Sequence, residues 1–142
     1  EGYCKAMSDS GLAVGADAVH IAITTEEEGR NYARNLLLGG NLPDGILFAG
    51  DFAARGAMEV FLNAGVRVPQ DIGIVGFVNE PWDKLLTPAL SSVEQFPGLI
   101  GETAAKMMLE AIEGMPARSV VFDTELVVRA SSLKGGAVGT KA

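Results

Sequence analysis

The stretch from Gly45 to Val93, GILFAGDFAARGAMEVFLNAGVRVPQDIGIVGFVNEPWDKLLTPALSSV, decides the fold of this chain. It opens with a short apolar run, Ile46 to Ala49, which has the length of a buried strand. A helical pattern from Asp51 to Ala64 follows, and then a second apolar run from Ile72 to Phe77. Strands that are apolar throughout and alternate with helices predict an α/β fold, in which helices cover a parallel sheet.

The helix from Asp51 to Ala64 carries clear start and stop signals. Aspartate is among the best N-cap residues, so Asp51 is predicted to cap this helix. Gly65 follows the last helical residue and is predicted to end it. The apolar residues of the helix that we expect in the core are Phe52, Met58, Phe61 and Leu62.

The residues before this stretch predict two helices and a strand. Gly2 to Ser10 has the pattern of a helix end, and Asp17 to Ile23 alternates in the manner of a strand. Thr25 and Glu28 have the spacing of a capping box, in which the two side chains bind backbone N–H groups at the start of a helix. That helix is predicted to stop at Gly39-Gly40.

The residues after the second strand predict a loop, a helix and a return to the sheet. Asn79 to Ala89 contains two prolines and reads as a loop, and Ser91 to Glu94 is short and extended. A helix with an apolar stripe begins at Phe96-Pro97 and runs to Gly114. Val120 to Arg129 predicts a long strand or strand pair, and the glycine-rich end from Leu133 is predicted to be a flexible tail.

Composition narrows the class of protein. The chain has 142 residues, of which 48% are apolar, and this predicts one ordinary domain with a substantial core. A net charge of −7 disfavours direct binding to nucleic acid, which needs clustered Lys and Arg. The single cysteine, Cys4, allows no internal disulfide and fits a reducing compartment, so we expect a cytoplasmic protein. No apolar run has the length of a membrane span, and no signal peptide is visible.

The sequence offers no combination of residues that supports catalysis. His20 is the one histidine and has no metal-binding partner, so we expect a structural role and no metal. The acidic run from Glu26 to Glu28 is explained by favourable charge at a helix start. Gly39-Gly40 lacks the signature of a phosphate-binding loop. We therefore expect neither an enzyme nor a bound cofactor.

Four runs in order carry a resemblance to a known family. They are AGDFAARGA at 49–57, AGVRVPQDIGIVGF at 64–77, PALSSVEQ at 88–95 and ELVVRASS at 125–132. Their order and spacing resemble the effector-binding domain of the lactose repressor (LacI/GalR) family of bacterial transcription regulators. The resemblance extends over nearly the whole chain, from Gly2 to Ser132.

The resemblance implies a type I periplasmic-binding-protein fold, in which two α/β lobes enclose a small effector. Residues 1–94 would belong to the C-terminal lobe, 95–119 to a helical crossing into the N-terminal lobe, 120–132 to the returning strands and 133–142 to a flexible tail. The N-terminal lobe and the helix-turn-helix that binds DNA would lie outside this chain. The chain begins with Glu1 on a helical pattern, so we expect a fragment of a longer protein.

The resemblance also implies which residues face the effector. Gly50 stands where the family usually has Asn, and Val78 stands where a polar residue binds a sugar or a base. Neither offers a side-chain hydrogen bond, so backbone groups, water, a less hydroxylated ligand or the other lobe must compensate. Asn79 and Glu80, which come immediately after Val78, are candidate substitutes for the missing polar contacts. The predicted effector-binding residues are Thr24, Gly50, Asp51, Val78, Asn79 and Gln95.

A second set of residues is predicted to lie in a homodimer interface. Trp82 fits an interface because tryptophan is enriched there, although it could instead stack on the effector. Arg55 is either a solvated helix residue or an interface ion-pair partner, and Glu28 lies in a region that the family places near the dimer contact. We expect the apolar helix from Pro97 to Ile112 to pack against a neighbouring chain or this chain's remaining lobe.

The functional prediction is a sensor fragment of a LacI-type transcriptional regulator. A small effector, a sugar or a related metabolite, would control DNA binding allosterically through lobe rotation. The alternative is a periplasmic solute-binding protein of the same fold that serves sugar transport. The VPQDIGIVGF run and the RASS ending favour the regulator.

Overall fold

A four-stranded sheet lies at the centre of the computed structural model, which describes residues 2–15, 18–22 and 24–134. The strand order is β1-β2-β3-β4, with β1, β2 and β3 parallel and β4 antiparallel to β3. The predicted α/β fold with a mostly parallel sheet is confirmed. The strands are β1 (Gly45–Leu47), β2 (Gly73–Val78), β3 (Ser91–Glu94) and β4 (Glu125–Val127).

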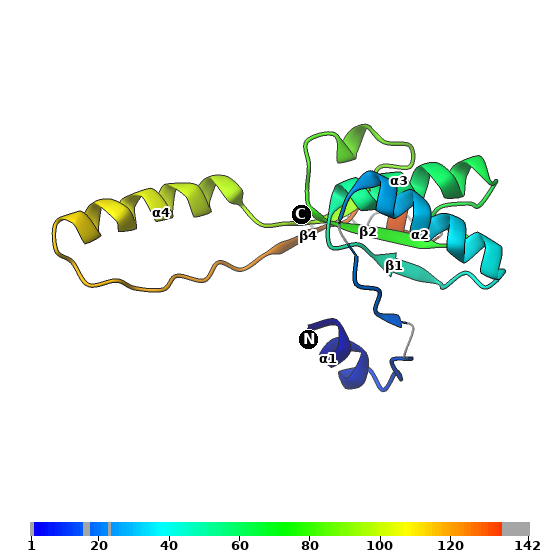
Figure 1. Ribbon diagram of the computed structural model, residues 1–142, viewed down its shortest axis with the longest axis horizontal. Coiled ribbons are helices and arrows are strands. Elements are labelled where there is room, and N and C mark those ends of the chain that lie inside the picture. Colours follow the sequence, from blue (N-terminus) through cyan, green and yellow to red (C-terminus); the bar gives the residue numbers. More distant parts are fainter. Residues whose placement is uncertain (1, 16–17, 23, 135–142) are drawn as a thin grey trace, which may run out of the picture.

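Two helices, α2 (Glu26–Gly39) and α3 (Asp51–Asn63), form a layer on one face of the sheet (Figure 1). α3 packs on β2, and α2 packs along α3. Glycines allow the helix backbones to approach closely. A Cβ atom on Gly56 would collide with the carbonyl oxygen of Glu26, and one on Gly29 would collide with the backbone of α3.

The ends of these helices follow the signals in the sequence. Thr25 Oγ1 accepts a hydrogen bond of 3.3 Å from the backbone N–H of Glu28, which is the threonine half of the predicted capping box. Gly40 ends α2 with φ of 69°, a left-handed conformation that glycine adopts without strain. Gly65, with φ of 78°, follows α3 as predicted.

The core lies between α3 and the sheet. Met58 and Phe61 are buried there as predicted. The prediction was wrong for Phe52 and Leu62, which are 46% and 39% exposed because their positions on the helix turn them away from the sheet. The largest apolar side chains that are fully buried are Phe61, Ile72, Ile74 and Leu90.

The N-terminal segment differs from the prediction. The expected helix is present as α1 (Gly2–Asp9), but the strand expected over residues 17–23 is absent from its described part, 18–22. The two ends of that predicted strand lie outside the described residues. A strand needs a hydrogen-bonding neighbour, and this segment runs apart from the sheet (Figure 1). His20 instead stacks on Tyr32 of α2, with ring centroids 4.9 Å apart.

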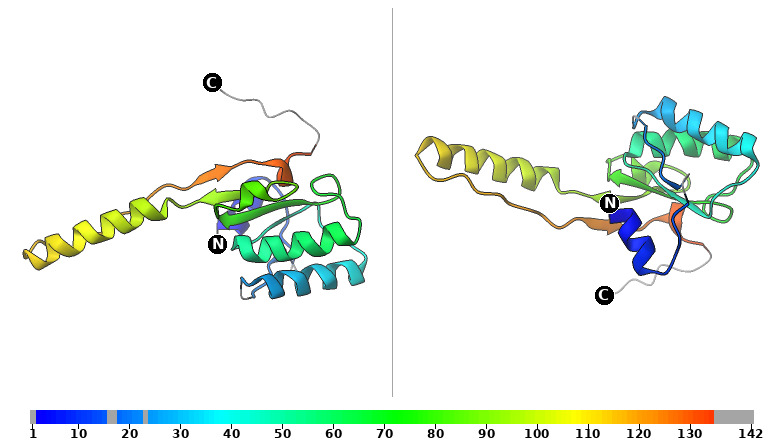
Figure 2. Two further views of the ribbon diagram at one scale, coloured as in Figure 1. Left: turned by 90° about the horizontal axis from the view of Figure 1, so that it is seen from above. Right: turned by 60° about the horizontal axis from the view of Figure 1, so that its bottom comes forward.

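A long arm projects from the sheet and consists of α4 (Pro97–Ile112) and the chain that returns from it (Figure 1). Figure 2 shows from two further sides that the arm extends away from the helical layer. No residue of α4 is buried. The strand predicted from Val120 to Arg129 forms only as β4, because its neighbour β3 ends at Glu94 and the chain then enters α4.

No described helix has the length and apolar character needed to cross a membrane. The predicted flexible tail lies outside the described residues from position 135 onward.

Candidate functional site

The carboxyl ends of β1 and β2 lie at the same edge of the sheet, because the two strands are parallel neighbours. Gly50 follows β1 and immediately precedes α3, and Val78 is the last residue of β2. Thr24 also reaches this edge, since a Cβ atom on Gly50 would lie 3.0 Å from the Cβ atom of Thr24. Three of the six residues predicted to face the effector therefore come from the start of α2, the start of α3 and the end of β2.

The backbone is strained at this edge. Val78 has φ of 125° and Asn79 has φ of 61°, in the range that L-residues rarely adopt. A β-branched residue with positive φ is a true outlier, and such strain is concentrated at functional sites. Phe96, with φ of 55°, is the other non-glycine residue of this kind in the described part of the chain. It lies between β3 and α4, where the arm begins.

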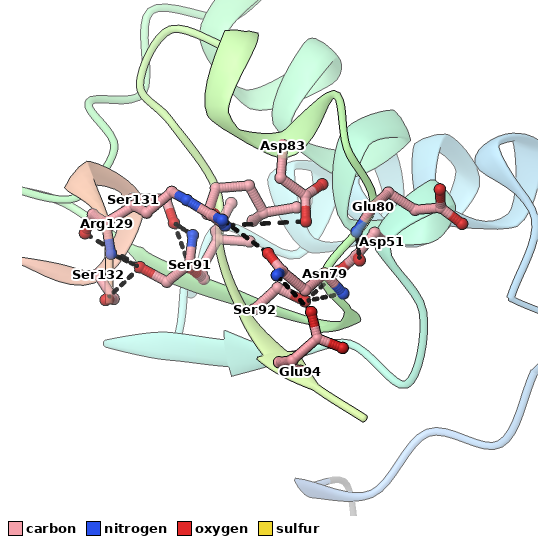
Figure 3. Close-up of polar contacts among 12 residues, drawn as sticks. Asp51, Asn79, Glu80, Asp83, Ser91, Ser92, Glu94, Arg129, Ser131 and Ser132 are labelled. Atoms are coloured by element: carbon pink, nitrogen blue, oxygen red, sulfur yellow. Dashed lines mark hydrogen bonds and ion pairs between the residues drawn. The ribbon is translucent and has the colours of Figure 1, made fainter. Parts of the chain in front are cut away.

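Asp51 does not cap α3, which corrects the prediction. The N-cap residue is Gly50, and no side chain caps the helix. The Asp51 carboxylate turns inward instead, with 1% of the residue exposed. Its Oδ1 accepts from Ser92 Oγ at 2.7 Å and its Oδ2 accepts from the backbone N–H of Glu80 at 3.0 Å (Figure 3). Gly76 makes room for it, because a Cβ atom there would collide with the carboxylate.

Asn79 is held by three hydrogen bonds, two to β3 and one to the chain that follows β4 (Figure 3). Its backbone N–H donates to Ser92 Oγ at 3.0 Å, and its Nδ2 donates to Glu94 Oε2 at 2.8 Å. Its Oδ1 accepts from Arg129 Nη2 at 2.6 Å. The amide of Asn79 therefore fixes the loop after β2 and has little capacity left for a ligand.

Glu94 connects this loop to the start of the arm. While one carboxylate oxygen accepts from Asn79, the other accepts from the backbone N–H of Phe96 at 2.6 Å. The hydrogen bond from Asn79, followed by that from Phe96, lowers the pKa of Glu94 below its ordinary value. Gln95 lies between these two contacts and is half-buried.

Arg129, Ser131 and Ser132 belong to the ELVVRASS run at 125–132 that resembles the family, but no role was predicted for them. Arg129 Nη1 donates to the carbonyl oxygen of Leu90 at 2.6 Å. Ser131 Oγ accepts from the backbone N–H of Ser91 at 2.8 Å and donates to the carbonyl oxygen of Ile74 at 2.6 Å. A single arginine before two serines, directly after a strand, was the signal that could have revealed this contact with β2 and β3.

The residues predicted for the dimer interface separate into two places. Trp82 packs on Phe52 with ring centroids 5.4 Å apart, and the Arg55 guanidinium lies 4.7 Å from the Trp82 ring centroid. Arg55 also forms an ion pair with Glu26. Glu28 lies elsewhere, where it lines a cavity of about 590 Å³ between the N-terminal segment, α2 and β1.

The described residues contain no group of three or more side chains that could hold a metal ion. At the sheet edge, the buried carboxylate and amide serve to position backbone, while Gly50 and Val78 present little polar surface. This arrangement forms a wall at the sheet edge whose backbone is held in place by hydrogen bonds within the protein.

Comparison with known proteins identifies the family. A family model described as a periplasmic binding protein-like domain matches residues 1–132. The lactose operon repressor of Rhizobium radiobacter is 37% identical over 113 residues, which are 78% of this chain and 99% of that sequence. The chain belongs to the LacI family of transcription regulators. The predicted family is thereby confirmed.

Other LacI-family proteins match over most of the chain. The HTH-type transcriptional repressor PurR of Pasteurella multocida (strain Pm70) is 32% identical over 133 residues, which are 92% of this chain and 40% of that protein. The crystal structure of a LacI-type transcription regulator from Bifidobacterium animalis subsp. lactis DSM 10140 superposes with a TM-score of 0.85 at 28% identity. That match covers 94% of this chain and 49% of the solved one. The chain thus spans less than half the length of both proteins, and both relatives matched by sequence are named as repressors.

Proposed function

We propose that this chain is the small-molecule-sensing part of a LacI-family repressor. The observation that carries the proposal is the strained wall at the carboxyl ends of β1 and β2, where Val78 and Asn79 have positive φ beside Gly50. In open parallel sheets, ligands bind in the crevice outside the carboxyl ends of the strands. Backbone strain that is held by several hydrogen bonds fits a surface preformed for binding.

The proposed effector is a sugar or a related metabolite, bound against Thr24, Gly50, Val78 and Gln95. Thr24 and Gln95 supply the polar side chains, because the oxygens and amide of Asp51 and Asn79 are already engaged within the protein. Asp51 and Asn79 then act as positioning residues that fix the wall. The apolar wall at Gly50 and Val78 favours an effector that turns a less hydroxylated face toward this lobe.

The arm is the part of the chain that, in the proposed sensor, crosses into a second lobe. In this proposal residues 1–94 form the C-terminal lobe, residues 95–119 cross into an N-terminal lobe, and residues 120–132 return. The exposed apolar side chains of α4 support this division, since Met108, Leu109 and Ile112 are each more than 60% exposed. An apolar helix face of this size is covered in the intact protein, and the rest of the regulator is its proposed cover.

Sensing requires that the effector favour one arrangement of the lobes over another. Two chain segments join the lobe to the arm side by side, one after β3 and one before β4. Phe96, which has positive φ, lies on the segment after β3, and its backbone N–H donates a hydrogen bond to Glu94. Glu94 in turn accepts a hydrogen bond from Asn79 at the wall. An effector that binds one lobe arrangement better shifts the equilibrium toward it, and DNA binding by a helix-turn-helix outside this chain changes with it.

A homodimer completes the proposal. Phe52 and Trp82 are aromatic side chains that contact the Arg55 guanidinium at the surface of α3 and the loop after β2. Aromatic residues and arginine are the types enriched at interfaces. We assign Trp82 and Arg55 to the contact with a second copy. Glu28 is not part of this aromatic cluster and instead lines the cavity between the N-terminal segment, α2 and β1, so we do not assign it to the contact.

The experiment uses the full-length regulator that contains this chain. Thermal unfolding is measured with a panel of monosaccharides, disaccharides and nucleobases, because a ligand that binds the folded state raises Tm. Each ligand that raises Tm is then tested for its effect on the binding of promoter DNA. We expect at least one sugar-like ligand to raise Tm and to change DNA affinity. A ligand that raises Tm without changing DNA affinity would favour the solute-binding alternative.

Two glutamines give a matched test of the proposed wall. Gln95 follows β3 at the proposed site, whereas Gln70 is exposed between α3 and β2, at the opposite end of the sheet. We expect Gln95→Ala to weaken effector binding by about 2- to 10-fold, the loss of one hydrogen bond. Gln70→Ala is expected to bind as the natural protein does. Equal affinities in all three proteins would place the effector elsewhere.

A further inference from the structure

Asp83 is a fully buried carboxyl group in the loop between β2 and β3. It begins a short 3₁₀ helix, η2 (Asp83–Leu85), and its exposed fraction is 0%. Its backbone N–H donates to the carbonyl oxygen of Glu80, and its own carbonyl oxygen accepts from the backbone N–H of Leu90, each at 3.0 Å. The loop from 79 to 90 is therefore folded around Asp83, and the side chain cannot reach water without opening the loop.

Within the described part of the chain, neither carboxylate oxygen of Asp83 receives a hydrogen bond. The Arg129 guanidinium stands 3.9 Å from Oδ2 and donates instead to the carbonyl oxygen of Leu90 and to Asn79. An ionised carboxylate that is buried without donors is strongly unfavourable. A neutral carboxylic acid fits the site better, and it has one proton to donate.

The buried Asp51 carboxylate belongs to the same polar cluster (Figure 3), because its Oδ2 accepts from the backbone N–H of Glu80, whose carbonyl oxygen accepts from the backbone N–H of Asp83. Each Asp51 oxygen already accepts one hydrogen bond and has a further lone pair. We propose that Asp83 is a neutral carboxylic acid that donates a hydrogen bond to Asp51, and that loss of this proton loosens the loop 79–90 from the start of α3. The proposal holds whatever effector the protein senses.

The charged groups around Asp83 come from three elements. Burial is the main cause that raises the pKa of Asp83 from 3.8 to about 7. The charge of Asp51 at the start of α3 and its hydrogen bond act in the same direction, as does Glu80 from the loop, and Arg129 after β4 opposes them. β3 contributes Ser92, which carries no charge. Once the proton leaves, Asp83 and Asp51 both carry a negative charge in this buried cluster, where Arg129 is 3.9 Å from Asp83 Oδ2.

The direction of the pH effect follows from the two states. Asp83 in the unfolded chain titrates at its ordinary value of 3.8, whereas in the folded chain its pKa is about 7. Between these values the folded state binds more protons, so the free energy of unfolding falls as the pH rises. The stabilisation by the shared proton is fully present below the lower value and is lost as the pH passes through the upper one.

Trp82 provides a built-in reporter. It is the one tryptophan of the 142-residue chain, it precedes Asp83, and it packs on Phe52 and Arg55. We expect the fluorescence of Trp82 in the intact 142-residue chain to change between about pH 5 and pH 9, with a midpoint near 7. Asp83→Asn has the same shape, stays neutral and can still donate to Asp51, so it should hold the low-pH signal throughout.

Two results of that titration overturn the proposal: an absent transition in the natural chain, and an unchanged transition in Asp83→Asn. Histidine is the other side-chain type that titrates near neutral pH, and His20 is the one histidine. His20→Asn is therefore the control and is expected to keep the transition. Loss of the transition in His20→Asn would also overturn the proposal, because Asp83 would then not be its source.

A second measurement does not depend on the variant folding. Carbon-13 NMR of the natural chain with labelled aspartate carboxyl groups follows the titration of each aspartate directly. We expect one aspartate to titrate near 7. If every aspartate titrates below about pH 5, Asp83 is ionised in the neutral range and the proposal is wrong.

Discussion

Ser92 donates a 2.7 Å hydrogen bond from its Oγ to Oδ1 of Asp51, and this bond joins β3 to the first residue of α3. The two residues are 41 positions apart in sequence, and both are buried. The same Ser92 oxygen accepts from the backbone N–H of Asn79 at 3.0 Å. One hydroxyl group therefore holds three elements together at the edge where we propose that the effector binds.

Removing this hydroxyl is expected to destabilise the fold. Ser92→Ala takes a donor from the buried Asp51 carboxylate and an acceptor from the half-buried N–H of Asn79, and alanine supplies neither group with a new partner. We expect the free energy of unfolding to fall by about 1–3 kcal/mol, measured by urea denaturation. Ser119→Ala is the control, because Ser119 is exposed in the returning arm and should change stability by less than about 0.5 kcal/mol. Equal stability of the two variants would contradict the role of Ser92.

The close approach of α2 and α3 gives a second prediction. A Cβ atom on Gly56 meets the backbone of Glu26, which cannot move aside as a side chain could. Gly56→Ala is therefore expected to lower the free energy of unfolding by about 1–3 kcal/mol, as overpacking does. Gly101 in α4 has open space around it, so Gly101→Ala should be neutral or stabilising by up to about 1 kcal/mol in the same denaturation experiment. A gain in stability for Gly56→Ala would mean that the helices are farther apart.

Local signals in the sequence were sufficient for much of the fold. The Thr25 cap, the left-handed Gly40 and the stop at Gly65 act within a few residues, so the sequence contains the whole cause. The strand predicted over 17–23 failed because a strand exists only with a partner, and alternation of side chains supplies none. The strand from Val120 was predicted too long for the same reason, since β3 sets the length of its neighbour.

The site was less predictable because its contacts are between distant residues. Asp51 fits the pattern of an N-cap, yet its partners lie 29 and 41 positions away, on Glu80 and Ser92. Asp83 stands in a loop with other polar residues, where a charged residue is normally solvated, and nothing nearby in sequence indicates its burial. The family resemblance located the sheet edge, and only the structure reveals that Asp51 and Asn79 are bonded within the protein.

The aromatic cluster at the outer surface gives a third prediction. Trp82→Ala removes the ring that packs on Phe52 and Arg55, so it should weaken the proposed dimer of the full-length regulator. We expect the dissociation constant in sedimentation equilibrium to rise at least about 10-fold, as for a central aromatic residue of an interface. Leu38 on α2 is 86% exposed, and Leu38→Ala should leave association unchanged. An unchanged dimer in Trp82→Ala would move the interface to another face.

Glu94 gives a prediction for acid conditions. Its pKa is lowered in the folded state, first by the hydrogen bond from Asn79 and then by that from Phe96. A lowered pKa means that the stabilisation is present above the ordinary value of 4.5 and is lost as the pH falls through the folded value. Thermal unfolding between about pH 3 and pH 6 should therefore show a smaller acid-induced loss of Tm in Glu94→Gln than in the natural chain.

A matched glutamate separates this effect from the general influence of acid. Glu113 is exposed directly after α4, and Glu113→Gln removes the same charge at a place where the chain makes no contact with the sheet edge. It should lose Tm in acid as the natural chain does. Because the amide oxygen introduced by Glu94→Gln could still accept from Asn79 or Phe96, a difference between the two variants reports the charge of Glu94 rather than its shape. Identical pH profiles for both variants would show that Glu94 is ionised no more readily in the folded state than in the unfolded chain.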